Sequence, residues 1–225
     1  MKRVVRQTLL PLMPARLRHW LIAQNRQPLF DCFRKAGLVY VHVPRTGGTS
    51  ISEAIFDSWI DHFTIREQLA TLPADVLAMP RFTVVRNPWE RALSSWSFAS
   101  AGTGHDARIY VENRHLYRAP EFRTFERFVL DWLPAQDPRK LDPLFRPQVH
   151  FLLDGAAGLP FDHIGRLELL AETEQWLTLQ LGRTISLPHF NRSVHGQYRE
   201  CYSTEMRNTV AQYYAEDVTR LGFEF

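Results

Sequence analysis

Three short segments predict β-strands. They cover residues 38–43, 81–86 and 161–166, and the first two are dominated by β-branched and aromatic side chains, in runs too short for a typical helix. Elsewhere, apolar residues recur at the spacing of one helix face. The helical segments predicted in this way are 50–56, 88–98, 122–132, 168–181 and 203–221. Strands that alternate with helices indicate an α/β domain, with a central, largely parallel sheet flanked by helices.

Positive charge is concentrated at the N-terminus. Residues 1–35 hold eight basic residues and one acidic residue, a balance of +7, so the other 190 residues hold 19 basic and 23 acidic residues, a balance of −4. We therefore divide the chain into a basic N-terminal arm, 1–37, and a domain, 38–225. The arm has two interpretations: an amphipathic segment on an anionic membrane surface, or an arm or helix packed on the body. Its prolines interrupt any long helix and favour the second.

Length and composition limit the remaining classes. With 225 residues, 45% hydrophobic and 23% charged, the chain is typical of a soluble globular protein with one core. Its apolar stretches are shorter than the roughly 20 residues of a membrane-spanning helix. Cys32 and Cys201 show neither CxxC nor metal-ligand spacing. We expect free thiols, no metal and a cytoplasmic location, with the arm as the candidate peripheral membrane contact.

The turn after the first predicted strand is a candidate anion site. Two glycines remove side-chain atoms from the approach to the backbone, and the following helix start exposes N–H groups at the positive end of its dipole. An ordinary tight turn explains the glycine pair equally well. No lysine follows the second glycine, so the turn is not a Walker A loop. The candidate binding residues are Arg45, Thr46, Gly47, Gly48, Thr49 and Ser50.

A second strand-to-helix turn offers another anion site. Arg86 ends its predicted strand, Asn87 is a candidate N-cap before a proline, and Ser94 lies two turns into the helix. An arginine can grip a phosphate with two parallel hydrogen bonds, and a serine hydroxyl can add a third. Arg91 is a further candidate, although it and Glu90 are expected on an exposed part of that helix.

These two motifs resemble those of a known family. Residues 42–50, HVPRTGGTS, are similar to the 5′-phosphosulfate loop of sulfotransferases, and residues 86–91, RNPWER, with Ser94 are similar to their 3′-phosphate motif. The pattern is most similar to the carbohydrate sulfotransferases of the chondroitin and heparan 2-O type and their bacterial relatives. Further likeness runs through 146–148, 164–168, 191–193 and 213–225.

The resemblance implies a fold, a donor and roles for the two motifs. It implies a P-loop-like three-layer domain that binds 3′-phosphoadenosine 5′-phosphosulfate without a metal. The loop from Arg45 to Ser50 would surround the 5′-phosphosulfate, and Arg86 and Ser94 would hold the 3′-phosphate. The family usually has lysine where this chain has Arg45, and that residue helps to neutralise charge on the leaving phosphate.

Transfer to a hydroxyl also needs a base. In the heparan 2-O relatives a histidine between the two donor motifs fills that role, and His62 occupies the similar place here. A histidine accepts a proton near neutral pH. The alternatives are a structural role for His62, with His150 or His163 as the base.

Three functions remain open from the sequence. The first is sulfuryl transfer from 3′-phosphoadenosine 5′-phosphosulfate to a glycan or other hydroxylated acceptor, with no nucleic-acid partner. The second is a non-catalytic module that binds a nucleotide or a sulfated polymer. The third and weakest is a nucleotide kinase, because the Walker lysine is missing. The polar stretch 100–120 is predicted to be a surface loop that contributes to acceptor choice.

Overall fold

The fold was described from a computed structural model, which places residues 26–102, 111, 114–138, 140–156, 158–187 and 198–225. Most of the predicted N-terminal arm, part of the 100–120 loop and the 191–193 motif lie outside these residues. No helix among the described residues is long and apolar enough to cross a membrane.

The centre of the fold is a parallel sheet with the order β1-β2-β3. The strands are β1 (Val39–Val41), β2 (Arg81–Val85) and β3 (His163–Arg166). Val41 pairs with Thr83, and Val85 pairs with Arg166. The predicted α/β class and the three predicted strands are confirmed. Because the strands are parallel, their carboxyl ends lie at one edge of the sheet.

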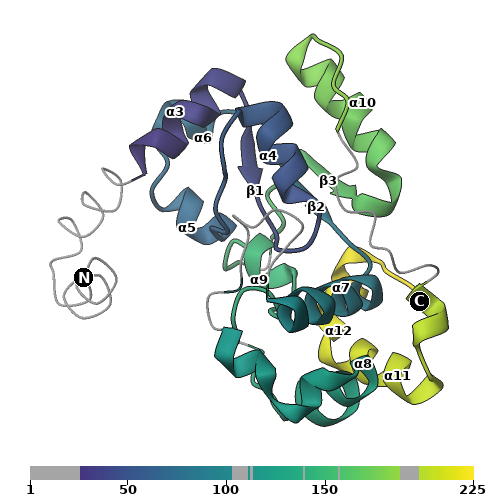
Figure 1. Ribbon diagram of the computed structural model, residues 1–225. Helices are drawn as coiled ribbons and strands as arrows, with labels where there is room; N and C mark the ends of the chain where they lie inside the picture. The colour runs from purple at the N-terminus through teal and green to yellow at the C-terminus, as the bar shows by residue number, and fades with distance from the viewer. Residues whose placement is uncertain (1–25, 103–110, 112–113, 139, 157, 188–197) are drawn as a thin grey trace, which may run out of the picture.

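Helices flank this sheet (Figure 1). They are α3 (Gln27–Ala36), α4 (Gly48–Phe56), α5 (Ile65–Leu69), α6 (Ala74–Leu77), α7 (Pro88–Ala101), α8 (Phe125–Arg127), α9 (Val149–Leu152), α10 (Leu170–Leu181), α11 (Thr204–Tyr213) and α12 (Ala215–Leu221). The described end of the predicted arm is helix α3, whose buried Phe30 and Phe33 pack into the core.

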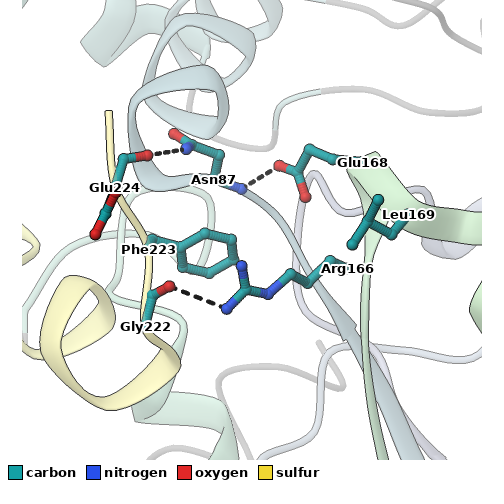
Figure 2. A pocket seen from close by; sticks show the side chains of 7 residues that line it. All are labelled: Asn87, Arg166, Glu168, Leu169, Gly222, Phe223 and Glu224. Atoms are coloured by element: carbon teal, nitrogen blue, oxygen red, sulfur yellow. Dashed lines mark hydrogen bonds between the residues drawn. The ribbon is translucent and has the colours of Figure 1, made fainter.

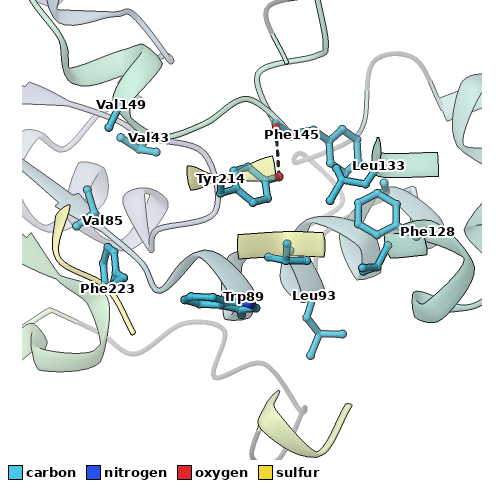
Figure 3. Packing of buried hydrophobic residues seen from close by; sticks show 14 of the residues in the cluster. Val43, Val85, Trp89, Leu93, Phe128, Leu133, Phe145, Val149, Tyr214 and Phe223 are labelled. Carbon is cyan, nitrogen blue, oxygen red and sulfur yellow. Dashed lines mark hydrogen bonds between the residues drawn. The ribbon is translucent and has the colours of Figure 1, made fainter. Parts of the chain in front are cut away.

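Side chains of the strands divide between two hydrophobic clusters. Tyr40, Phe82 and Val84 pack with the helices α3, α4, α6 and α10. Val41 and Val85 belong to the other cluster, with α7, α9, α11 and α12. Successive strand residues point to opposite faces, so the sheet lies between two layers of helices. Figure 3 shows the second cluster, in which α7 packs close to the aromatic residues of the 120–145 region.

Two predicted helices are divided. The segment 122–132 is a 3₁₀ turn, the short helix α8 and a π-helical turn, because the extended backbone of Thr124 interrupts it and the Thr124 hydroxyl caps Arg127 N. The segment 203–221 breaks at Tyr214 into α11 and α12. The Tyr214 hydroxyl donates to Phe145 O over 3.1 Å, which fixes this break against the core.

Candidate functional site

The two predicted anion motifs meet at the carboxyl edge of the sheet. The loop between β1 and α4 contacts the start of α7: the Arg86 guanidinium donates to Arg45 O through Nη1 over 3.3 Å. The end of β3 joins them, because the Asn87 N–H donates a short hydrogen bond to the Glu168 carboxylate. Burial raises the pKa of Glu168, and the bond from Asn87 opposes that shift. Three strand ends therefore converge on one site.

Residues 44–50, called the anion loop below, lead from β1 into α4 and have an unusual backbone. Arg45 and Gly47 both adopt positive φ, +68° and +80°. That region is uncommon for a non-glycine residue and easy for glycine. Thr46 is fully buried, and its hydroxyl donates to Val43 O over 2.9 Å, so this side chain stabilises the turn itself. Thr49 and Ser50 lie in the first turn of α4, where the helix exposes its N–H groups.

Arg45 and Ser94 contact each other directly. Arg45 Nε and Nη2 donate to Ser94 Oγ over 3.1 and 2.9 Å, and its guanidinium lies 4.6 Å from the centre of the Phe98 ring. Burial, aided by the nearby charges of Arg86 and Arg91, lowers the Arg45 pKa to about 10. The side chain is still protonated at neutral pH. The sequence placed these two residues in separate motifs, and the structure brings them together.

Arg86 is held from two sides. Its side chain is 6% exposed and forms an ion pair with Glu90, with 2.8 Å between Nη2 and Oε1. Its backbone is bound in both directions by the buried Gln148 amide: Arg86 N donates to Oε1 over 2.9 Å, and Nε2 donates to Arg86 O over 2.8 Å. Asp217 in turn accepts from the backbone of Gln148 and Val149. This buried chain of hydrogen bonds fixes where the Arg86 side chain begins.

The expected exposure of Arg91 is wrong. It is 1% exposed, and its Nε donates to Pro44 O over 2.9 Å, so it holds the anion loop from beneath. Burial lowers the Arg91 pKa, while Tyr214 and Asp217 oppose that shift. The helix pattern missed this residue because α7 is enclosed on both sides. The tight turn after β1 does indicate such a residue, because its buried carbonyl groups need hydrogen-bond donors.

His62 lies close to the loop and has a defined tautomer. Its Nδ1 is 3.0 Å from His42 O, a carbonyl that only accepts, so Nδ1 carries the proton and Nε2 carries the lone pair. Burial lowers the pKa of His62, against opposing effects of the His42 carbonyl and Asp61. The ring is therefore neutral near pH 7. The structure places this candidate base beside β1, close to the anion loop.

The two alternative histidines are placed differently. His163 is the first residue of β3, at the opposite end of that strand from the site, and stacks on Trp176 with a centroid distance of 5.0 Å. His150 is an exposed residue of α9, with Nε2 3.2 Å from Arg146 Nη1. Neither makes a hydrogen bond or ring contact with the described residues of the loop.

A pocket of about 350 Å³ opens beside the second motif (Figure 2). Arg166 crosses it, with the guanidinium 4.6 Å from the centre of the Phe223 ring and bonded to Leu221 O and Gly222 O. Asn87 Nδ2 donates to Glu224 O over 2.8 Å, so residues 222–224 form one wall. The pocket combines carboxylate, guanidinium and aromatic surfaces next to the start of α7.

Known proteins provide no direct guide to this site: no family model, curated protein or solved structure matches the chain. Within the described residues, no group of three or more histidine, cysteine or acidic side chains is arranged to hold a metal ion.

Proposed function

We propose that this chain is a P-loop-like sulfotransferase, with three layers, that moves the sulfuryl group of 3′-phosphoadenosine 5′-phosphosulfate to a hydroxyl of a glycan or other acceptor. The contact between Arg45 and Ser94 carries the proposal. It puts the cation of one motif beside the hydroxyl of the other, at the carboxyl edge where α/β proteins bind ligands. The resemblance of both motifs to those of sulfotransferases supplies the identity of the donor.

The surrounding charge also supports a dianionic ligand. Burial lowers the pKa of Arg45, and the nearby charges of Arg86 and Arg91 lower it further. Of these three arginines, Glu90 pairs with Arg86. An anion bound here would relieve the repulsion between the guanidinium groups. The N-terminus of α4 adds N–H donors and the positive end of a helix dipole.

In the proposed reaction, the protein aligns two substrates and stabilises charge. The acceptor oxygen attacks sulfur, the bond from sulfur to the 5′-phosphate oxygen breaks, and its electron pair stays on that oxygen, beside Arg45. His62 Nε2 takes the acceptor's proton. This role fits the lone pair at Nε2 and the lowered pKa of His62.

The proposal includes a cytoplasmic location. Cys32 and Cys201 are both free thiols, which fits a reducing compartment. The described part of the predicted arm is the helix α3, which packs on the core through Phe30 and Phe33.

Calorimetry with adenosine 3′,5′-bisphosphate tests donor binding. We expect binding by the unmodified chain, and a loss of about tenfold to a hundredfold in affinity for Arg86→Ala, since a charged, two-point contact is removed. Arg127→Ala is the matched control, because the one ion pair of Arg127 with the described part of the chain is with Asp131 on an exposed helix turn. Equal affinities for the two variants would reject the assignment of Arg86.

The reaction itself is tested with ³⁵S-labelled donor, glycans and phenols. Labelled acceptor supports sulfuryl transfer. Donor binding without transfer to any acceptor would favour the non-catalytic module, and magnesium-dependent use of ATP would favour a kinase.

A further inference from the structure

His42, the first residue of the 42–50 motif, lies between the loop of residues 44–50 and the candidate base. It directly follows β1 and is 3% exposed. Its Nδ1 is 2.6 Å from Ile60 O, so this nitrogen carries the proton. Burial lowers the pKa of His42 well below its ordinary value, and the neutral ring is fixed at the floor of the site.

The His42 ring occupies the space of a side chain at Gly48. A Cβ on Gly48 would lie 1.9 Å from Nε2 and 2.0 Å from Cδ2 of His42, which no packing tolerates. Gly48 starts α4 and does not have positive φ, so its backbone alone would accept alanine. Gly47 differs, because its φ of +80° favours glycine whatever surrounds it. The two glycines therefore have separate physical causes.

The same residue holds the candidate base. His42 O accepts the proton of His62 Nδ1, and the two rings lie 4.1 Å apart between centroids. Trp59 packs edge-on against both rings, at 5.3 and 5.9 Å. One side chain and its carbonyl thus touch the start of α4 on one side and the base on the other.

We propose that His42 is a positioning residue that sets the anion loop and His62 relative to each other, and that Gly48 is glycine because the His42 ring requires the space. The consequence for transfer rests on the proposed function. The packing relation between His42 and Gly48 does not.

A set of paired variants tests this relation through the unfolding equilibrium in urea. Gly48→Ala should raise the unfolding constant by about tenfold or more, because the added methyl meets the ring. In a His42→Ala background, the same change should alter it by less than about threefold. His42→Asn keeps an amide donor for Ile60 O but withdraws the ring, so Gly48→Ala should be tolerated there too. Gly47→Ala is the matched control, and removal of the His42 ring should not rescue it.

The same variants are then tested for adenosine 3′,5′-bisphosphate. Gly48→Ala should weaken binding by about tenfold or more, and His42→Ala combined with Gly48→Ala should bind within about threefold of His42→Ala alone. For the base, His42→Ala keeps the carbonyl that accepts from His62 Nδ1 but removes the ring that packs against His62 at 4.1 Å. The ring N–H of His62 in ¹⁵N-labelled protein should therefore exchange faster with solvent in His42→Ala than in the unmodified chain. If His42 only packed against Gly48 and did not position His62, the exchange rate of this proton would stay unchanged.

The outcomes separate the two proposals. If the unmodified chain binds no bisphosphate, the proposed function fails, and the urea and proton-exchange measurements still decide the role of His42. Additive effects of the His42 and Gly48 changes on unfolding would overturn the packing relation. An unchanged exchange rate of the His62 proton in His42→Ala would overturn the positioning of the base.

Discussion

Replacing Arg91 with methionine tests whether the buried guanidinium supports the anion loop. The change keeps a long side chain but removes the charge and the donor to Pro44 O, 2.9 Å away. A second acceptor, Leu144 O, lies 3.4 Å from Nη2 but keeps the Ser95 hydroxyl at 3.1 Å. Pro44 O is therefore the acceptor that loses its donor without a replacement.

The magnitude follows from two costs and from two effects that offset part of them. An unsatisfied buried carbonyl costs about 1 to 3 kcal/mol. Removing one partner of a buried ion pair costs about 3 to 5 kcal/mol, and the loss here is smaller, because Asp217 is a nearby charge and not a direct ion-pair partner of Arg91. Asp217 keeps two backbone N–H donors, and the buried guanidinium no longer has to be desolvated, so both reduce the loss. We expect Arg91→Met to lower the free energy of unfolding by about 2 to 4 kcal/mol at pH 7.

The dependence on pH identifies the cause. Burial raises the pKa of Asp217 in the folded chain, and Arg91 opposes that shift, so the variant should raise it further. A carboxyl group with a raised pKa in the folded state contributes stability below its unfolded pKa and loses it as pH rises through the folded pKa. The cost of Arg91→Met should therefore be smaller near about pH 4 than at pH 7.

Urea unfolding followed by circular dichroism measures this cost. Arg127→Met is the control, because Arg127 has a 47% exposed side chain and only a surface ion pair, worth less than about 1 kcal/mol. A loss below about 1 kcal/mol for Arg91→Met at pH 7 would refute the supporting role of Arg91. A loss that is equal at both pH values would refute the part assigned to Asp217.

Three further predictions concern the proposed reaction. Arg45→Lys keeps the charge but loses the two-point contact with Ser94. We expect its affinity for adenosine 3′,5′-bisphosphate, measured by calorimetry, to stay within about tenfold of the unmodified chain. A larger change would show that the planar guanidinium group is essential. For His62→Ala, turnover of ³⁵S-labelled donor should fall by roughly a hundredfold with donor affinity retained. A base works only when it is deprotonated, and the pKa of His62 is lowered from the ordinary histidine value of about 6.5. In the unmodified chain, the rate should therefore be constant at neutral pH and fall only at pH values below about 6.5. A fall that begins above pH 7 would contradict this prediction.

The sequence predicted the strands and the start of α7 because local chemistry determines them. Asn87 accepts from Trp89 N and Glu90 N at the N-cap, with proline in the first turn. The segment 122–132 was predicted less well, since Thr124 and tertiary packing of the Phe122 and Phe128 rings interrupt its helical periodicity. Periodicity records one face of a helix and does not detect such interruptions.

The site was predicted only in part, because sequence patterns report local motifs and not contacts across the fold. Arg45, Ser94 and Arg86 were found through local motifs, but their contacts join residues 41 to 49 positions apart, which no local pattern reports. His42 and Arg91 were missed as supports because their roles depend on what lies across the fold, at Gly48 and Pro44.

The charge of the site explains why its supports are buried. Arg86 has Glu90, and Arg91 has the nearby Asp217, whereas no ion pair identified among the described residues includes Arg45. Arg45 instead meets a neutral hydroxyl and an aromatic ring, and burial beside two other arginines makes its charge costly. A flexible loop would relieve that cost by turning Arg45 outward. Anchoring of the loop by Arg91 and by the packing of His42 against Gly48 resists this movement, so the positive charge of Arg45 stays at the site proposed for the anionic donor.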